Sequence, residues 1–355
     1  MDYNDEIQAA VEWKTTREQV AIWCSRDLVP GAEPAGDGWK IPKNAPRPRA
    51  EDLVSPKPEP VAKPFLKWAG GKTQILDQIR ARYPEGLGRE LDRYAEPFVG
   101  SGAVLFDVLS RYDMGEIYIG DTNRELIACY QTVRDRVDEL TEILERYEKD
   151  YLPGDAAARK LFYTQARTRF NQLKKEASHV TELAALFIFL NHTCFNGLYR
   201  VNSEGEFNVP MGSYRNPTIC DAKNLRAVSQ ALAGVNITCA GYGQSLGIIN
   251  SSSFVYVDPP YRPLSPTSRF TSYVQGAFGD PEQAELARFV DEAVEKGAYV
   301  LVSNSDPKNT DPQDDFFDRL YAKHAIERIK AVRVINSVAT GRGAITELLI
   351  VGYKK

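Results

Sequence analysis

The sequence has few of the residues that form disulfides or bind metals, and it contains no long apolar run. Its cysteines (24, 129, 194, 220 and 239) show no paired spacing, and its histidines (179, 192 and 324) form no ligand cluster with them. This pattern disfavours disulfides and a zinc site and predicts buried free thiols in a reducing compartment. No stretch approaches the length of a membrane span, and the acidic N-terminus does not resemble a signal peptide. We expect a soluble, cytoplasmic protein with no metal centre.

An overall excess of basic residues is also missing. The chain has 44 lysines and arginines against 48 acidic residues, which gives a formal net charge of −4. A surface that binds nucleic acid must therefore be local, because the protein as a whole is not positively charged. With 355 residues, 43% of them hydrophobic, the chain can bury a large core and is expected to hold roughly two or three domains.

The most informative stretch is Asp258-Pro-Pro-Tyr261. It follows Phe254–Val257, a short apolar run typical of a strand that is buried on both faces. The prolines end that strand and leave Asp258 and Tyr261 at its carboxyl end, where open α/β sheets bind ligands. A carboxylate and a constrained carbonyl can accept both hydrogens of an exocyclic amine, while the ring stacks on the base. A plain proline turn capped by Asp258 is the alternative, and the tetrapeptide alone does not decide between them.

Three further motifs precede this strand. Phe65–Lys72 places two glycines before a lysine at a helix entry, where backbone amides can bind an anion, although the spacing is not that of a P-loop. Tyr94–Ala103 predicts a strand, a glycine turn and a helix start, so that a ligand can approach the backbone closely. Ile117–Asn123 predicts a second strand that ends at Asp121, an acid placed to accept hydrogen bonds from ribose hydroxyls. Each could be a simple turn, but their order favours a ligand site.

Together these motifs resemble those of the Dam-type DNA adenine-N6 methyltransferases, which use S-adenosylmethionine. The resemblance runs from Phe65 almost to the C-terminus. It extends to Asn196–Asn202, Gly205–Pro210, residues 333–337 and Glu347–Leu349. It implies an α/β fold, in which a Rossmann-like methyltransferase sheet carries a helical DNA-recognition insertion.

The resemblance also implies roles for individual residues. Asp258 and the Pro259 carbonyl would accept the two N–H bonds of a flipped-out adenine, and Tyr261, after Pro260, would stack on the base. The residues expected to hold S-adenosylmethionine are Trp68, Lys72, Glu96, Phe98, Gly100, Gly102, Asp121, Tyr242 and Asp258. Those expected to contact double-stranded DNA, with GATC as the target sequence, are Lys67, Phe195, Asn196, Leu198, Arg200 and Pro210.

The chain departs from the family pattern at two positions. Gly241 stands where an acidic residue is common, which puts the cofactor contacts there in doubt. Ser213 stands where many members carry an arginine that contacts the DNA backbone. Cytosine-N4 methylation is the nearest alternative, but those enzymes usually have Ser before Pro-Pro-Tyr. A non-catalytic DNA-binding regulator is a second alternative, and intact cofactor motifs argue against it.

The remaining segments suggest a division into parts. Residues 1–45 are expected to form a small module that weakly resembles an excisionase-like winged helix or helix-turn-helix, with a packing appendage as the alternative. Its signals are a capping-box pattern at Thr15–Glu18 and a short strand ending at Trp39–Pro42. Residues 46–63 form a proline-rich linker. Residues 64–130 and 231–355 would form the catalytic domain, and residues 131–230 the DNA target-recognition insertion.

Within that insertion, basic residues occur in a stretch that has no acid between positions 156 and 175. They are Arg159, Lys160, Arg167, Arg169, Lys174 and Lys175. A phosphate-contacting face and a solvated helix face are equally good interpretations of this stretch. A restriction endonuclease acting on the same DNA site is a candidate partner, and the sequence does not decide whether there is one.

Overall fold

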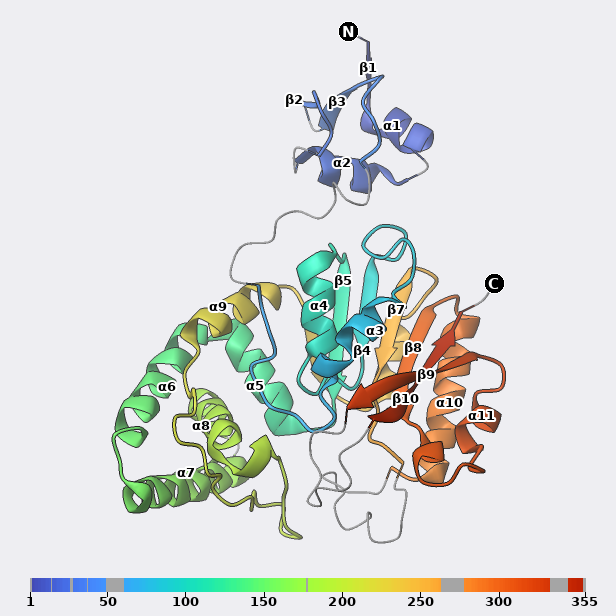
Figure 1. Cartoon of the computed structure of the whole chain (residues 1–355). Helices are drawn as coiled ribbons and strands as arrows, with labels where there is room; N and C mark the ends of the chain where they lie inside the picture. Colours follow the sequence, from blue (N-terminus) through green and yellow to red (C-terminus); the bar gives the residue numbers. More distant parts are fainter. Residues whose placement is uncertain are drawn as a thin grey trace. The chain divides into compact units, whose positions relative to one another are not determined.

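The computed structural model describes residues 2–13, 15–25, 28–36, 38–48, 61–176, 178–262, 278–332 and 344–353. Contacts between Cα atoms divide the chain into two compact units, which are described separately (Figure 1). One comprises Met1–Pro58, to which Arg111–Asp113 are assigned, and the other comprises Glu59–Ser110 and Met114–Lys355. Most of the predicted linker and the stretch 333–337 lie outside the described residues. The predicted domain boundaries stay predictions.

The N-terminal unit combines two short helices with a small antiparallel sheet. Its elements are β1 (Tyr3–Asn4), α1 (Glu6–Trp13), α2 (Arg17–Ser25), β2 (Glu33–Ala35) and β3 (Gly38–Pro42), with β3 in the middle of the sheet. The helix after Thr15 and the strand around Trp39 occur as predicted, whereas α1 was not foreseen. A core that includes Trp13, Trp23 and Ile41 holds the unit together. Its assignment as a winged helix stays a prediction.

The larger unit is built on a sheet whose strand order in the described residues is β6-β5-β4-β7-β8-β10-β9. The strands are β4 (Arg93–Glu96), β5 (Glu116–Asp121), β6 (Asn236–Cys239), β7 (Ser253–Val257), β8 (Tyr299–Ser305), β9 (Ala325–Val332) and β10 (Ala344–Gly352). The pairs from β6 through β8 are parallel, and β10 runs antiparallel to both β8 and β9. This mainly parallel α/β sheet confirms the predicted fold class.

The chain reverses its direction of travel across the sheet between β4 and β7. After β4 the chain builds β5 and β6 on one side, and it then returns to place β7 and β8 on the other. The carboxyl ends of β4 and β7 therefore border a topological switch point, which is where open α/β sheets bind ligands. Every residue of β7 is buried, as its apolar sequence predicts.

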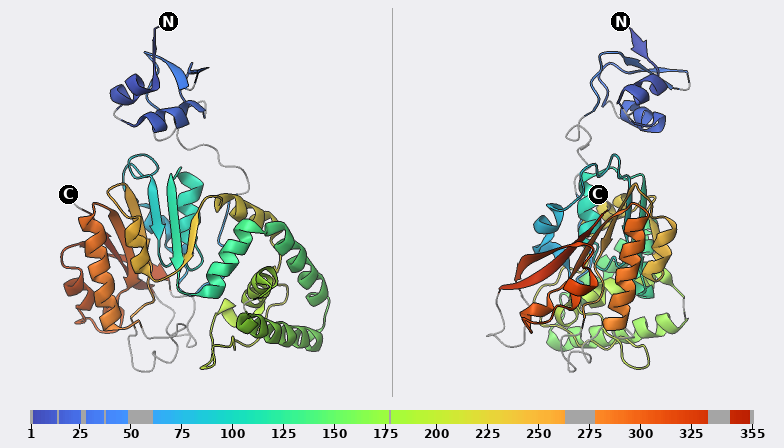
Figure 2. Two further views of the ribbon diagram at one scale, coloured as in Figure 1. Left: turned by 180° about the vertical axis from the view of Figure 1, so that it is seen from behind. Right: turned by 90° about the vertical axis from the view of Figure 1, so that its right-hand side faces the viewer.

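Helices cover both faces of the sheet. Helices α3 (Leu76–Arg80) and α4 (Ala103–Arg111) lie on one face, and α10 (Asp280–Glu295) lies on the other (Figures 1 and 2). Val255 and Val257 of β7 share a core cluster with α10, whereas Phe254 faces the opposite way and contacts Tyr83 and Tyr94. This alternation follows from the two-residue period of a strand. Gly297 (φ +92°) closes α10, as its position after the apolar stripe predicts.

A second group of helices spans residues 124–231, a range that contains the predicted insertion at residues 131–230. It consists of α5 (Arg124–Asp135), α6 (Val137–Tyr151), α7 (Ala156–Glu176), α8 (Val180–Thr193) and α9 (Ala222–Ala231). Helix α8 packs against α5, α6 and α7, and its residues from Ala184 to Asn191 are all buried. The apolar run Leu186–Asn191 is therefore buried where these helices meet.

Within the described residues, no helix is both long enough and apolar enough to cross a membrane.

The separate cores lead to a prediction about folding. A shortened chain that starts near Pro60 should fold by itself, because the sheet and its helices keep their own buried cluster when the N-terminal core is removed. Circular dichroism and thermal unfolding of the shortened and full chains would test this. A shortened chain that lacks a cooperative unfolding transition would show that the first unit is required by the larger one.

Candidate functional site

The predicted catalytic carboxylate lies at the carboxyl end of β7 and is held from two sides. Ser303 of β8 donates a hydrogen bond from Oγ to Oδ1 of Asp258 at 2.9 Å, and the Tyr256 hydroxyl lies 2.9 Å from the same Oγ. On the other side, Nζ of Lys72 lies 2.7 Å from Oδ2. Lys72 is 4% exposed and the Asp258 side chain 20% exposed. The carboxylate therefore has a fixed direction and retains an exposed edge.

The rest of the tetrapeptide is held in the same manner. The Tyr261 hydroxyl donates to Oε2 of Glu347 at 3.0 Å, and Lys72 Nζ lies 5.0 Å from the centre of the Tyr261 ring. Gln283, which is fully buried in α10, donates to the Pro260 carbonyl at 3.1 Å. Side chains from three surrounding elements thus immobilise a segment that has no regular structure of its own.

One buried cation stands among several carboxyl groups in this site. Burial opposes the charge on Lys72, but Asp258, Tyr256 and Glu347 outweigh it and raise its pKa. Burial also raises the pKa of Glu347, against the pull of Lys72. For Glu96, at the end of β4, burial raises the pKa to about 8, and the nearby Asp258 charge adds to this effect. The site thus holds a lysine paired with one carboxylate, and two further carboxyl groups whose pKa values burial raises.

The glycine turn after β4 brings the backbone close to aromatic side chains. Gly100 has φ +47°, and a Cβ there would lie 2.9 Å from Cδ1 of Trp68. Gly102 has φ +72°, and a Cβ there would lie 2.7 Å from the Tyr130 hydroxyl. Both positions require glycine for conformation and for space. The turn also reaches the next strand, because the Gly100 amide donates to the Asp121 carboxylate.

Two predicted cofactor residues form an aromatic pair beside this turn. The rings of Phe98 and Tyr242 stack with their centres 5.5 Å apart and their planes 28° apart. Tyr242 begins the short helix η3 (Tyr242–Gly247), and a Cβ on the preceding Gly241 would meet nothing within 4 Å. An acidic side chain of the kind common in the family would therefore fit at position 241.

Taken together, these residues fit S-adenosylmethionine, whose net charge is positive. The excess of carboxyl groups suits its sulfonium and ammonium groups, Asp121 ends the strand after the glycine turn, and the aromatic pair offers a flat apolar surface. The structure brings the predicted residues around one edge of the sheet, since Lys72 and Asp258 form an ion pair and Trp68 contacts the Gly100 turn.

The predicted DNA-contacting residues are joined by a buried asparagine. Asn191, at the end of α8, accepts a hydrogen bond from the Lys67 amide at 2.8 Å and donates to the carbonyls of Lys67 (2.8 Å) and Gly197 (3.0 Å). A Cβ on Gly197 would lie 2.5 Å from Cβ of Lys67. Lys67 is therefore adjacent to the loop that begins at Phe195, despite their separation in sequence.

That loop presents its side chains outward. Phe195 is 50% exposed, and Asn196 adopts a left-handed conformation with φ +54°. The Phe195 amide donates to the Pro210 carbonyl at 2.9 Å, which closes the loop at its base. Nε of Arg200 donates to Oδ1 of Asn208 at 2.8 Å, so the guanidinium is oriented. Of the predicted set, Lys67, Phe195, Asn196, Arg200 and Pro210 are exposed, and Leu198 is half-buried.

Comparison with known proteins agrees with this geometry. A family model described as D12 class N6 adenine-specific DNA methyltransferase matches residues 68–335. The chain belongs to this family. It is similar to the type II methyltransferase M.MjaIII of Methanocaldococcus jannaschii, with 45% identity over 82% of this chain and 99% of that protein. It is also similar to a DNA adenine methylase of Escherichia coli (strain K12), with 34% identity over 80% of this chain and 93% of that protein.

Solved structures add little to the assignment. A precorrin 8W decarboxylase from Methanobacterium thermoautotrophicum covers 83% of this chain and 96% of its own, with a TM-score of 0.33 and 10% identity. That likeness is too slight to bear on fold or function. The family match, together with the relatives, identifies the protein as an enzyme that methylates adenine N6 in DNA.

The basic stretch of α7 in this methyltransferase is largely engaged within the protein. Arg169 pairs with Glu182 at 2.8 Å, Lys175 with Glu206 at 2.6 Å, and Lys174 with Glu125 at 3.1 Å. Arg159 donates to the carbonyls of Leu152 and Arg215. The choice between a phosphate-contacting face and a solvated helix face stays open, because Arg169 and Lys175 remain accessible in their ion pairs.

Several residues of the methyltransferase site were missed by the sequence reasoning. Ser303 and Asn304 lie in β8, Gln283 lies in the first turn of α10, and Glu347 lies in a matching segment to which no role was given. All of them are polar groups on β8, β10 or α10. Polar residues in the run Ser303–Asp306, at the carboxyl end of a buried strand, were the available signal. Among the described residues, no group of His, Cys, Asp and Glu could hold a metal ion.

The raised pKa of Glu96 predicts a pH-dependent stability. Its ordinary value is 4.5 and its value in the fold is about 8, so the native enzyme keeps a proton that the unfolded chain loses. The contribution of Glu96 to the free energy of unfolding is therefore full below pH 4.5 and is lost as the pH rises toward 8. In the absence of cofactor, the Tm of Glu96→Gln should increase relative to the Tm of the parent as the pH rises from 5 to 8. A difference in Tm that does not change across this range would contradict the assignment.

Proposed function

We propose that this methyltransferase moves a methyl group from S-adenosylmethionine to N6 of a flipped-out adenine in double-stranded DNA, with GATC as its site. The observation that carries the proposal is the exposed edge of a rigidly held Asp258, beside the ring of Tyr261 and the glycine turn. That arrangement suits an amine presented next to a methyl donor. The family and its relatives support the reaction, and the names of the DNA adenine methylases support the Dam-like target.

S-adenosylmethionine, when bound, supplies an electrophilic methyl group on a good leaving group. The residues that would hold it are Trp68, Lys72, Glu96, Phe98, Gly100, Gly102, Asp121, Tyr242 and Asp258. Lys72 contributes by keeping the carboxylates of the site paired, and the glycines contribute by letting the backbone approach the ligand. Glu96, which is neutral below about pH 8, is placed to ionise when a cationic group enters the site.

Asp258 does its work by accepting hydrogen bonds from the target amine. Each oxygen of a carboxylate has two lone pairs, so Oδ1 and Oδ2 can accept a further bond beyond those from Ser303 and Lys72. Asp258 would accept a hydrogen bond from one N–H of the amine, and the Pro259 carbonyl would accept one from the other. These two bonds would draw the amine nitrogen toward a tetrahedral geometry and stabilise the positive charge that develops on it. Asp258 need not be a strong base, because the methylated amine becomes acidic after transfer.

Tyr261 would stack on the extruded adenine. Flipping a base out of duplex DNA costs a few kcal/mol, part of which stacking in a pocket offsets. The ring is fixed at its hydroxyl by Glu347 and flanked by Lys72, so little further ordering is needed when the base arrives.

Recognition of the site would come from the surface formed by Lys67 and the loop from Phe195 to Pro210. Arginine and asparagine side chains match the edges of guanine and adenine in the major groove, and Arg200 and Asn196 are exposed. Phe195 is an exposed aromatic ring that can insert between bases. We assign target recognition to residues 131–230, and we regard an endonuclease for the same site as a candidate partner.

Substitution of Asp258 tests the chemistry. Asp258→Ala should lower methyl transfer by several orders of magnitude, because the amine loses its acceptor, while cofactor binding remains measurable. Turnover on duplex DNA and calorimetric titration with S-adenosylmethionine would check the two expectations. Asp77→Ala is a suitable control, since that side chain is 91% exposed and pairs only with its helix neighbour Arg80 among the contacts described. Near-normal turnover of Asp258→Ala would refute the role.

Mapping of methylated adenines tests the sequence preference. DNA from cells that express the methyltransferase should carry N6-methyladenine in GATC. Arg200→Ala should reduce discrimination at one base pair by roughly 1–3 kcal/mol, the value of a bidentate base contact. Methylation confined to a different sequence would show that the loop does not recognise GATC, and an unchanged preference in Arg200→Ala would exclude that base contact.

A further inference from the structure

Glu347 is a half-buried acid in a segment that matches the family, and it has no assigned role of its own in the proposed reaction. It lies on β10, where it pairs in register with Ser305 of β8. Its Oε2 accepts the hydrogen bond from the Tyr261 hydroxyl at 3.0 Å. Burial raises its pKa, which means that the charged form is costly in this position. An apolar residue would suit the interior of a strand better, so the acid calls for an explanation.

We propose that Glu347 is a positioning residue for methyl transfer, which sets the plane of the Tyr261 ring before the target base arrives. The inference rests on the proposed stacking role of Tyr261. A tyrosine ring attached to a proline-rich turn is fixed at one end by the backbone and free to rotate at the other. The bond to Glu347 fixes the hydroxyl end, and Lys72 lies near the ring at 5.0 Å from its centre.

Lys72 connects Glu347 to the catalytic carboxylate. Its Nζ is 2.7 Å from Oδ2 of Asp258, and the charge of Glu347 helps to keep Lys72 protonated. Lys72 in turn counteracts the burial that raises the pKa of Glu347. Glu347 therefore holds the Tyr261 ring, and Lys72 holds the Asp258 carboxylate. These are the two groups proposed to meet the adenine. Glu347 thus contacts Tyr261 directly and acts on Lys72 through its charge.

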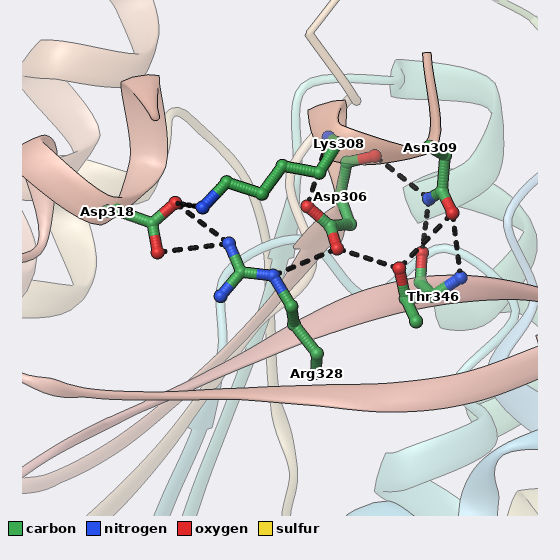
Figure 3. A network of polar contacts seen from close by, with 6 residues as sticks. All are labelled: Asp306, Lys308, Asn309, Asp318, Arg328 and Thr346. Atoms are coloured by element: carbon green, nitrogen blue, oxygen red, sulfur yellow. Dashed lines mark hydrogen bonds and ion pairs between the residues drawn. The ribbon is translucent and has the colours of Figure 1, made fainter. Parts of the chain in front are cut away.

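The position of Glu347 along β10 is itself fixed by a neighbouring polar network (Figure 3). Thr346 donates from Oγ1 to the Asp306 carboxylate at 2.7 Å, and Arg328 of β9 donates to the same oxygen at 3.0 Å. Asn309, in the short helix η5 (Pro307–Asn309), accepts from the Thr346 amide at 3.0 Å and donates to its carbonyl at 2.7 Å. Asp306 is 1% exposed. The residue before Glu347 is thus held by both its backbone and its side chain.

A second layer closes this network on its outer side. Arg328 also donates to Asp318 of α11 (Phe316–Leu320) at 2.8 Å, and Lys308 pairs with the same carboxylate at 3.0 Å (Figure 3). Strand β10 therefore cannot slide relative to β8 without breaking the bond from Thr346 to Asp306 and the two bonds between Thr346 and Asn309. Such rigidity would be unnecessary for a strand that only fills the sheet, and it is useful where one side chain must reach a reactive residue.

A double-mutant cycle in the full chain tests the proposal. The variants are Glu347→Ala, Glu347→Gln, Tyr261→Phe and the double variant Glu347→Ala with Tyr261→Phe. Glu347→Ala should lower kcat by about 10²-fold, because misplacement of the stacked base by about 1 Å has an effect of that size. Tyr261→Phe keeps the ring and loses the bond, so it should show a similar loss. The kcat of the double variant should be no lower than that of either single variant, because the two substitutions remove the same hydrogen bond.

Two further readouts separate positioning from a structural defect. The fluorescence of 2-aminopurine, placed at the target adenine of a duplex, reports whether the extruded base stacks, and both single variants should change it relative to the parent. Glu347→Gln should recover at least tenfold of the kcat lost in Glu347→Ala, because its amide oxygen still accepts from the hydroxyl. Glu327→Gln is the matched control, since that acid lies on β9 and pairs with Arg82 away from the site.

The outcomes distinguish this proposal from the one on which it rests. If the parent enzyme neither methylates adenine in duplex DNA nor alters 2-aminopurine fluorescence, the proposed function fails. If the parent does both, additive losses in the double variant, or a normal kcat in Glu347→Ala, overturn the positioning role alone. Where Glu347→Ala does not fold, Tyr261→Phe alone decides: a normal kcat together with unchanged 2-aminopurine fluorescence in that variant overturns the positioning role.

Discussion

The ion pair between Lys72 and Asp258 determines how the active site is assembled. A buried charge is costly unless it is paired, and Lys72 is almost fully buried. The segment that precedes β4 must therefore lie against the carboxyl end of β7. In this segment the carbonyl of Gly70 also accepts a hydrogen bond from Lys72 Nζ at 2.6 Å. That return brings Trp68 against the glycine turn and Lys67 beside the recognition loop. Removal of either partner would leave an uncompensated charge between the cofactor residues and the catalytic tetrapeptide.

A second set of contacts connects the predicted cofactor residues with the loop that is predicted to contact DNA. The Trp68 ring stacks on Tyr199, with ring centres 6.0 Å apart and planes 21° apart. The Tyr199 hydroxyl donates to Glu125 at 3.0 Å and accepts from Lys174 at 2.9 Å. Tyr199 stands between Leu198 and Arg200 in the sequence, so the backbone of the recognition loop is attached to the same aromatic group that borders the glycine turn. The predicted cofactor residue Trp68 and the predicted DNA-contacting loop are therefore joined by one ring contact.

The acidic residues at the ends of strands could be predicted from the sequence. The residues that hydrogen-bond to the tetrapeptide and fix its position could not. Asp258, Glu96 and Asp121 each follow an apolar run at a topologically predictable edge, so their convergence could be foreseen. Ser303, Gln283 and Glu347 reach the tetrapeptide because of how β8, α10 and β10 are placed in the fold. The pairing register of strands and the packing of a helix are tertiary properties that no local sequence pattern specifies. The basic stretch of α7 illustrates the opposite difficulty. Its charges were evident, but their acidic partners come from distant segments such as Glu125 and Glu206.

Strand β10 follows β9 in the chain and yet lies between β8 and β9, paired with both. During synthesis, β8 and β9 must therefore wait with open edges until the segment from Ala344 to Gly352 has left the ribosome. Unpaired edges are sites for incorrect pairing, so this stage is the most vulnerable in the folding of the larger unit. Glu347 arrives with that segment. The hydrogen bond between Tyr261 and Glu347 can therefore form only after the last strand of the sheet has been made.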